Sequence, residues 1–376
     1  MNITVEREHF WPLISQIQGL LEKRTNTPIF ENVLIKTEGE HITLYASDSE
    51  LSFSGHFPGK VNTPGSLVVN GKRLFEIIRE LSSGAMTLSN ESHRKIQITK
   101  GDSKFQIHSL KDEDFPVFPP VQTKDFQKFK AKELLESIDK TVYCTSLDDS
   151  RYHLMGVFLE SFPKESKYRW VATDGYRLSC MDTPMKQKLE FTDQQIIIPK
   201  KGLQEIKKML SSAEENDEVD IAIEVPRLIV HFKNQKLGIR LIEGAYPDYK
   251  RLIPDDPGKE ISLDREEFLA GLRRVSVLAS ARFKGVTFSF TKSKLTMEFI
   301  NTDTQEEARE IINCESQTSK LKIRLNSKYV LDVLHSMKKK RVKMFFKASS
   351  SPCLFKEEES EEENKNYICI VMPMRF

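Results

Sequence analysis

The sequence predicts an α+β protein that is built from three tandem copies of one domain. Each copy contains, in the same order, a helix with one apolar face, a pair of strands that ends near an aspartate, and a second helix. The three aspartates, Asp48, Asp174 and Asp303, follow one another at nearly equal intervals. Such regularity indicates a tandem repeat, and its period is long enough for each copy to form its own core.

Helices are predicted where apolar residues recur at helical spacing. The first helices of the three copies cover residues 9–24, 130–140 and 263–276, and the second helices cover residues 70–83, 199–212 and 326–341. Leu74, Leu203 and Val330 take equivalent apolar positions in the second helices. The same pattern is therefore used three times.

Strands are predicted between the helices, in segments rich in β-branched and aromatic residues. The predicted hairpins pair residues 33–36 with 42–45, 156–160 with 169–172, and 286–290 with 295–299, and further strands cover 219–223 and 227–232. Helices that cover one face of antiparallel sheets give an α+β domain. Segments that contain proline close the first two copies, so we expect domains over residues 1–120, 125–250 and 254–376.

The length and composition are those of a globular protein without a membrane span. A chain of 376 residues fits three domains of the usual size, which is ~100–150 residues. No apolar run approaches the ~20 residues that cross a bilayer, and residues 1–7 lack the features of a signal peptide. We therefore expect a cytoplasmic protein that does not contact membranes.

The five cysteines predict neither a disulfide framework nor a zinc site. They are odd in number, far apart and without a C-x-x-C pair, so we expect reduced thiols that pack as small apolar side chains. The eight histidines show no ligand spacing such as H-E-x-x-H. Neither a metal nor another cofactor is expected.

The distribution of charge is more informative than the net charge of +2. The predicted helices are basic in sum and the rest of the chain is acidic. The basic residues gather above all at Lys200, Lys201, Lys207, Lys208 and residues 338–341. For one helix a solvated face is the ordinary explanation, but the separation as a whole favours a basic surface that contacts phosphates without reading sequence. The acidic run 357–363 is expected to form a mobile hairpin tip, because clustered like charges resist burial.

No catalytic constellation is found. Residues 65–72 resemble a phosphate-binding loop, but the glycines are one residue too far apart and Arg73 stands where Ser or Thr would bind magnesium. The repeated aspartates occur once per copy, so they cannot act as a carboxylate pair, and we expect them to accept backbone N–H groups in turns. The prediction is a non-enzyme. A hydrolase or nuclease with an unusual site stays the alternative, although no carboxylate spacing favours it.

Several segments resemble the family of bacterial DNA sliding clamps, the beta subunits of DNA polymerase III. The resemblance covers the whole chain in order and is strongest in residues 151–157, 171–178, 246–251, 283–286 and 372–376. It implies a non-catalytic DNA replication factor, a homodimeric ring of two head-to-tail chains around double-stranded DNA. It also implies partners that carry clamp-binding peptide motifs, namely the replicative polymerase, the clamp loader and other replication and repair proteins.

The geometry of packed helices also favours two chains. Helices pack about 10 Å apart and are about 10 Å thick, so six of them would enclose a hole of only ~9 Å, whereas twelve would enclose ~28 Å. Duplex DNA fits only the second ring. A DNA-binding scaffold that does not encircle DNA is the alternative.

The resemblance implies a pocket for short apolar peptides near the C-terminus. It maps to Leu154, Thr173, Gly175, Tyr176, Arg177, Leu178, Pro247, Arg251, Leu252, Ile370, Val371, Met372, Pro373, Met374 and Arg375. Flexible methionine side chains can repack around different partners. The alternative for residues such as Leu178 and Val371 is that they belong to the core. Tyr176 stands where many relatives have His.

The resemblance also implies DNA contacts and a dimer interface. The DNA contacts map to Arg24, Arg73, Tyr152 and His153, with Lys200 and Lys201 as supporting charge. Tyr152 and His153 could instead be a half-buried packing pair. The interface pairs an edge strand over residues 104–108 with the third domain, because paired edges avoid wrong association. Its residues are Lys72, Phe105, Ile107, Val277, Leu278, Glu306 and Glu307, with Lys72 and Arg73 facing Glu306, Glu307 and Glu310.

Overall fold

The structure, a computed structural model, divides into two compact units. It describes residues 1–21, 28–39, 41–92, 95–110, 112, 115–116, 121, 125–185, 195–279, 284–316, 321–358 and 366–375. Unit 1 comprises Met1–Leu135 and Lys201–Leu241, and unit 2 comprises Glu136–Lys200 and Ile242–Phe376. The division falls inside the second repeat, so the units do not coincide with the repeats. The described helices include none that is long and apolar enough to cross a membrane.

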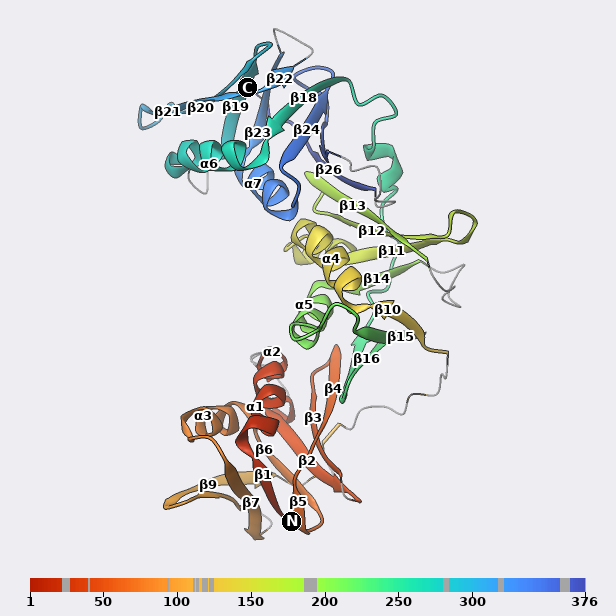
Figure 1. Cartoon of the computed structure of the whole chain (residues 1–376), viewed down its shortest axis with the longest axis vertical. Coiled ribbons are helices and arrows are strands. Elements are labelled where there is room, and N and C mark those ends of the chain that lie inside the picture. Colours follow the sequence, from red (N-terminus) through yellow and green to blue (C-terminus); the bar gives the residue numbers. More distant parts are fainter. Residues whose placement is uncertain are drawn as a thin grey trace. The chain divides into compact units, whose positions relative to one another are not determined.

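Unit 1 contains a 13-stranded sheet in the order β10-β15-β16-β17-β4-β3-β2-β6-β9-β8-β7-β1-β5. Its elements are β1 (Asn2–Glu6), α1 (Arg7–Gln16), α2 (Gln18–Leu21), β2 (Asn32–Glu38), β3 (His41–Ser47), β4 (Leu51–Phe57), β5 (Lys60–Thr63), β6 (Ser66–Asn70), α3 (Gly71–Glu80), β7 (Ala85–Ser92), β8 (Lys95–Lys100), β9 (Ser103–Leu110), β10 (Gln127–Lys130), β15 (Glu218–Glu224), β16 (Arg227–Phe232) and β17 (Gln235–Arg240), with α4 (Ala131–Thr141) and α5 (Lys200–Met209) at the division (Figure 1). The ladder between β17 and β4, in which Leu237 faces Phe53, joins the second repeat to the first.

Unit 2 contains a nine-stranded and a four-stranded sheet, in the orders β14-β11-β12-β13-β26-β25-β24-β18-β22 and β21-β20-β19-β23. Its elements are β11 (Gly156–Phe162), β12 (Lys167–Thr173), β13 (Arg177–Pro184), β14 (Ile196–Pro199), β18 (Lys259–Asp264), α6 (Arg265–Val275), β19 (Gly285–Phe290), β20 (Lys294–Asn301), β21 (Glu306–Asn313), β22 (Glu315–Ser316), β23 (Leu321–Asn326), α7 (Ser327–Ser336), β24 (Arg341–Phe346), β25 (Cys353–Glu357) and β26 (Tyr367–Val371). The ladder between β13 and β26 joins the second repeat to the third.

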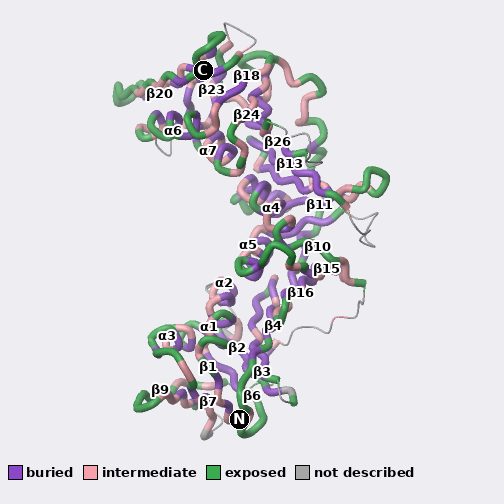
Figure 2. The backbone as a smooth tube through the Cα atoms, viewed as in Figure 1, coloured by how far each residue is buried: buried purple, intermediate pink, exposed green. Residues whose placement is uncertain are grey.

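The structure confirms the α+β class and the predicted hairpins β2–β3, β11–β12 and β19–β20. Helices α3, α6 and α7 each have a side-chain N-cap. The cap residues Asn70, Asp264 and Asn326 each accept a backbone N–H of the first turn. The predicted helix over residues 9–24 is interrupted at Ile17, and residues 22–24 lie outside the described part. Buried residues follow the strands and the inner helix faces (Figure 2).

Strand β26 separates two apolar cores in unit 2. Ile368 and Ile370 pack in a cluster with Leu178 and Tyr249, whereas Tyr367, Cys369 and Val371 pack in the larger core that includes Phe355. This alternation follows from the period of two along a strand. All five cysteines are buried and free, which confirms that they pack as small apolar residues.

The prediction for the end of the last helix is wrong. Helix α7 ends at Ser336, so the basic run 338–341 lies outside the helix, and Arg341 already begins β24. Met337 is extended and buried, and the backbone N–H groups of Lys338 and Lys339 both donate to Glu357 Oε1. A carboxylate from another strand therefore holds this turn, and no local pattern could reveal it.

Glu357 also corrects the prediction of a mobile acidic tip. It belongs to β25, and its side chain is only 12% exposed, while residues 359–363 lie outside the described part. Its Oε2 accepts from Lys140 Nζ at 2.8 Å, and Lys140 Nζ lies 4.5 Å from the centre of the Tyr367 ring. Burial raises the pKa of Glu357, but the hydrogen bonds from Lys140 and the two backbone N–H groups outweigh it, so the pKa is lowered.

We predict that Lys140→Ala lowers the free energy of unfolding by about 3 kcal/mol, because it leaves the Glu357 carboxylate buried without its cation. Lys128→Ala is the matched control, since the pair of Lys128 with Glu218 is exposed and its loss should cost at most ~1 kcal/mol. Chemical denaturation followed by circular dichroism measures both. Equal effects of the two substitutions would contradict the prediction.

The lowered pKa of Glu357 predicts how this contribution depends on pH. A carboxyl whose pKa is lower in the folded protein stabilises it above the unfolded pKa, about 4.3, and loses this effect as pH falls through the folded value. Denaturation midpoints of the parent chain and Lys140→Ala should therefore converge as pH falls below about 4. A difference that stays constant at acid pH would exclude the ion pair as its origin.

Candidate functional site

The repeated aspartates form turns in two of the three copies, as predicted. Asp48 Oδ1 accepts the backbone N–H groups of Glu50 and Leu51, both at 2.7 Å. Asp174 Oδ1 accepts those of Tyr176 and Arg177 at 3.0 and 3.1 Å. In the third copy the prediction is wrong for Asp303, because Asn301 Oδ1 takes the acceptor role and receives the backbone N–H of Asp303.

The Asp174 turn also fixes the side chain of Arg177. Arg177 Nε donates to Asp174 Oδ2 at 3.0 Å, Nη1 donates to Asp332 Oδ2 at 2.6 Å, and Nη2 donates to the Tyr143 carbonyl at 2.7 Å. Burial lowers the pKa of Arg177, but its charged neighbours outweigh burial and raise it, so the guanidinium stays charged. Gly175 supplies the left-handed residue of the turn, with φ of +87°.

The C-terminal segment is docked beside this turn. In the ladder of β13 with β26, Leu178 faces Ile370 and Arg177 faces Val371. The chain continues past the strand, since Met372 N donates to the Tyr176 carbonyl at 2.9 Å and Met374 N donates to the Arg324 carbonyl at 2.8 Å. These hydrogen bonds hold an apolar tail that would otherwise fray.

We call Leu178, Leu252, Ile370 and Met372 the apolar cluster, because they pack in one core group in unit 2. Leu178 and Ile370 form its floor, and the partly buried Leu252 and Met372 reach the surface. Most residues predicted for the peptide pocket therefore lie on neighbouring strands and turns. Val371, which is also predicted to line the pocket, does not belong to this cluster. Its side chain packs in the larger core on the opposite side of β26.

The other predicted pocket residues surround this cluster in different ways. Leu154 is buried, Thr173 Oγ1 donates to the Arg177 carbonyl at 2.6 Å, and Tyr176 is 59% exposed. The residues that lie at the surface are Pro247, Arg251, Met374 and Arg375, while Pro373 is half-buried. Arg177 turns to the opposite face of β13 from Leu178, so its guanidinium is not a wall of the apolar cluster.

The predicted DNA-binding residues have different surroundings. Arg24 lies outside the described residues. Arg73 is exposed near the start of α3, and Tyr152, half-exposed in a short helix with His153, is accessible to a ligand. The prediction that Lys201 supplies supporting charge for DNA needs correction. Its ammonium group is paired with the buried carboxylate of Asp48, which neutralises its charge.

The predicted interface residues lie on strands with free edges. Strand β9 pairs with β8 along its length but with β6 only at Ser109 and Leu110, so Phe105 and Ile107 belong to a stretch whose second edge has no partner among the described strands. Strand β21, which carries Glu306 and Glu307, is the terminal strand of its sheet.

The remaining interface residues lie beside these strands. Lys72 is exposed on α3, Val277 is 78% exposed, and Leu278 is partly buried against the core of unit 2. Glu310, which the sequence predicted to face Arg73 of another chain, is paired within unit 2: Arg274 Nη2 and Nε donate to its carboxylate at 2.9 and 3.0 Å.

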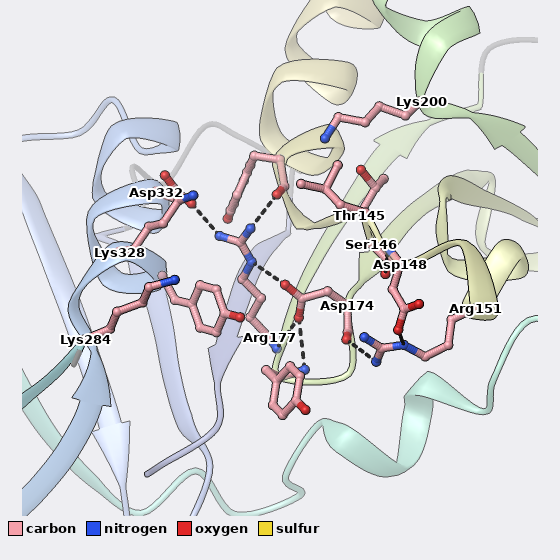
Figure 3. Close-up of a pocket in the computed structure, with 14 residues that line it drawn as sticks. Thr145, Ser146, Asp148, Arg151, Asp174, Arg177, Lys200, Lys284, Lys328 and Asp332 are labelled. Carbon is pink, nitrogen blue, oxygen red and sulfur yellow. Dashed lines mark hydrogen bonds and ion pairs between the residues drawn. The ribbon is translucent and has the colours of Figure 1, made fainter. Parts of the chain in front are cut away.

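A cavity of about 580 Å³, which the sequence did not predict, is lined by Tyr176 and by several charged side chains. We call it the lysine pocket, because Lys200, Lys284 and Lys328 line it together with Arg151 and Arg177 (Figure 3). Asp148, Asp174 and Asp332 also line it. The lysines are far apart in the sequence, so only their position beside the resembling segments could have indicated it.

The lysine ammonium groups are not matched by acidic partners. Within the described residues, Lys200, Lys284 and Lys328 form no side-chain hydrogen bond or ion pair, whereas each of the three aspartates is bonded to an arginine. Burial lowers the pKa of Lys200, and the nearby Arg177 and Lys328 lower it further. The cavity therefore holds more positive charge than its own residues neutralise.

Comparisons with known proteins agree over the whole chain. Family models described as the N-terminal, central and C-terminal domains of the DNA polymerase III beta subunit match residues 1–119, 128–248 and 250–375. The chain is 29% identical to the beta sliding clamps of Haemophilus influenzae and Escherichia coli, with all of each chain covered. It is similar to the solved DNA polymerase III beta subunit of Pseudomonas aeruginosa (TM-score 0.90, 27% identity) and to the Bartonella birtlesii sliding clamp bound to griselimycin (TM-score 0.93, 27% identity), again over full length.

We predict that Asp174→Ala lowers the free energy of unfolding by about 2–3 kcal/mol. The substitution removes the side chain that accepts two backbone N–H groups and that pairs with the buried guanidinium of Arg177. Asp303→Ala is the matched control from the third repeat and should change stability by at most ~0.5 kcal/mol. Denaturant titration measures both variants. Similar decreases in the free energy of unfolding for the two variants would show that the hydrogen bonds of Asp174 do not stabilise the fold.

Proposed function

Since the chain belongs to the DNA polymerase III beta subunit family, we propose that it is a processivity factor that encircles duplex DNA and tethers the replicative polymerase. It contributes no chemistry to nucleotide transfer. The observation that carries the proposal is the threefold repeat, in which a helix pair packs on sheets in each copy. Three copies supply six helix positions, and by the packing arithmetic above only twelve enclose a hole wide enough for a duplex.

A ring then requires two chains, which we propose to join head to tail. Support comes from the free edges of β9 and β21, which could pair as antiparallel strands and satisfy each other's backbone groups. Phe105 and Ile107 of one chain would pack near Val277 and Leu278 of the other, and Lys72 could face Glu306 and Glu307. The rim charges would set the orientation of the two chains.

The contact with DNA is proposed to be sequence-independent and weak. Arg73, Tyr152, His153 and Lys200 are the described candidates, and Arg24 is retained from the family resemblance. Phosphate contacts and bridging water place no demand on base identity, so a closed ring can slide while it stays attached by topology. Net charge of only +2 fits this, because a strongly basic ring would bind tightly and stall.

The apolar cluster is the proposed docking site for peptide motifs of the polymerase, the clamp loader and other replication and repair proteins. Met372 and Leu252 are partly buried and reach the surface above the floor formed by Leu178 and Ile370. A thioether at such a position can adapt to side chains of different shape. We also retain as proposals the domain bounds 1–120, 125–250 and 254–376, and a cytoplasmic location beside the bacterial chromosome.

The ring is tested by DNA topology. When the protein is loaded onto nicked circular plasmid by the clamp loader of its own organism, we expect co-elution with the DNA on gel filtration. A restriction enzyme that cuts the plasmid once should release the protein, because a ring slides off free ends, whereas an enzyme without a site should not. Retention on the linear form would favour a scaffold that does not encircle DNA. Shortened DNA after incubation with magnesium alone would favour a nuclease.

The peptide site is tested by replacing the two methionines of the tail. We predict that Met372→Ala with Met374→Ala weakens binding of a polymerase-derived peptide by about 5- to 150-fold, because about 1–3 kcal/mol of apolar contact is lost. Fluorescence anisotropy measures the affinity, and sizing in solution should show an unchanged dimer. An unchanged peptide affinity would remove the tail from the site.

A further inference from the structure

We infer that the lysine pocket is a carboxylate-binding site, which takes a Glu or Asp side chain that flanks the apolar motif of a partner peptide. This inference rests on the proposed peptide-binding function and specifies the chemistry of the partner. The pocket and the apolar cluster meet at Tyr176. Its ring lines the pocket, while its carbonyl accepts the backbone N–H of Met372, a member of the cluster. The guanidinium of Arg177 in the pocket and the side chain of Leu178 in the cluster lie on opposite faces of β13, so a peptide on the cluster would reach the pocket by passing around the exposed Tyr176 turn.

The charge of the pocket selects an anion. Lys284, which directly precedes β19, and Lys328, in the first turn of α7, come from the third repeat, and Lys200 comes from the second (Figure 3). Within the described residues their ammonium groups have no acceptor, although Lys200 is half-buried beside Arg177 and Lys328. Gathering like charges in a cavity is unfavourable, and an anion placed among them reverses the effect.

The same walls favour a single carboxylate over a strand of nucleic acid. Asp148, Asp174 and Asp332 line the pocket, and their oxygens are already held by Arg151 and Arg177. A strand that ran through the pocket would bring successive phosphates past these carboxylates, which is less favourable than one carboxylate among the lysines. This repulsion applies inside the pocket and leaves open the proposed contact of a duplex with Lys200 from outside. One carboxylate can instead reach the lysines on a flexible side chain. Lysine suits this role, because it offers a mobile point charge without fixed geometry.

The test compares peptides that differ only in flanking charge. A fluorescein-labelled peptide with an apolar Leu and Phe core is extended by Glu-Glu or by Gln-Gln, at the N-terminal end in one pair and at the C-terminal end in the other. With the full-length chain at low salt, one Glu-Glu peptide should bind about five- to tenfold more tightly than its Gln-Gln counterpart. Raising the salt concentration should reduce this preference, because exposed charges are screened.

The variant Lys284→Ala with Lys328→Ala should lose the preference and keep the affinity for the Gln-Gln peptides. Lys164→Ala with Lys292→Ala is the matched control, since it removes the same charge from exposed positions of unit 2 that lie away from the pocket. Equal binding of Glu-Glu and Gln-Gln peptides at both ends, or a preference that survives in the pocket variant, would overturn the inference. Loss of affinity for a duplex or single-stranded oligonucleotide in the pocket variant, without any Glu-Glu preference in the parent, would assign the pocket to phosphate instead.

Failure of the proposed function gives a different result. If no peptide binds in either form, the docking site itself is wrong and the inference falls with it. If the Gln-Gln peptides bind and Glu-Glu adds nothing, the docking site stands and only the carboxylate site is excluded. Thermal unfolding of each variant shows that loss of the preference does not arise from loss of the fold.

Discussion

The antiparallel ladder between β13 and β26 is the constraint on which the candidate site of unit 2 depends. Its register sets Leu178 beside Ile370 and Arg177 beside Val371, and successive residues of a strand face opposite sides. One pair therefore contributes to the apolar cluster, while Arg177 reaches Asp332 of α7 on the other side. A slip of one residue would exchange the two faces, so apolar docking and the charged pocket arise from a single pairing.

Much of the architecture could be predicted from the sequence because its signals are local. Apolar spacing located most of the helices and β-branched segments located the hairpins to within a few residues, whereas the first helix is interrupted and the last one ends earlier than predicted. The turn role of Asp48 and Asp174 also followed from residue chemistry, since a short carboxylate readily accepts backbone N–H groups two and three residues later. The third copy departs at Asp303 because Asn301, an equally good acceptor, precedes it and takes the role.

The features that could not be predicted depend on partners far away in the chain. The acidic run is predicted to be solvated, yet Glu357 forms an ion pair with Lys140, which lies 217 residues earlier in the sequence. Lys201 looked available, but Asp48 neutralises it. The lysine pocket assembles Lys200, Lys284 and Lys328 from two repeats, and no spacing rule connects them. Charge patterns in a sequence show how many charges exist and leave open which of them are already paired.

The placement of the division inside the second repeat has a consequence for how such a chain could be shortened or lengthened. The sheets cross the repeat boundaries, because β17 continues the sheet of β4 and β13 continues that of β26. Deleting the middle copy would leave β4 and β26 each with one unpaired edge, and unpaired strand edges promote aggregation. The copies are therefore not independent domains that could be exchanged for one another. Each copy is joined to its neighbour by backbone hydrogen bonds, so a copy cannot be removed or added without breaking a sheet.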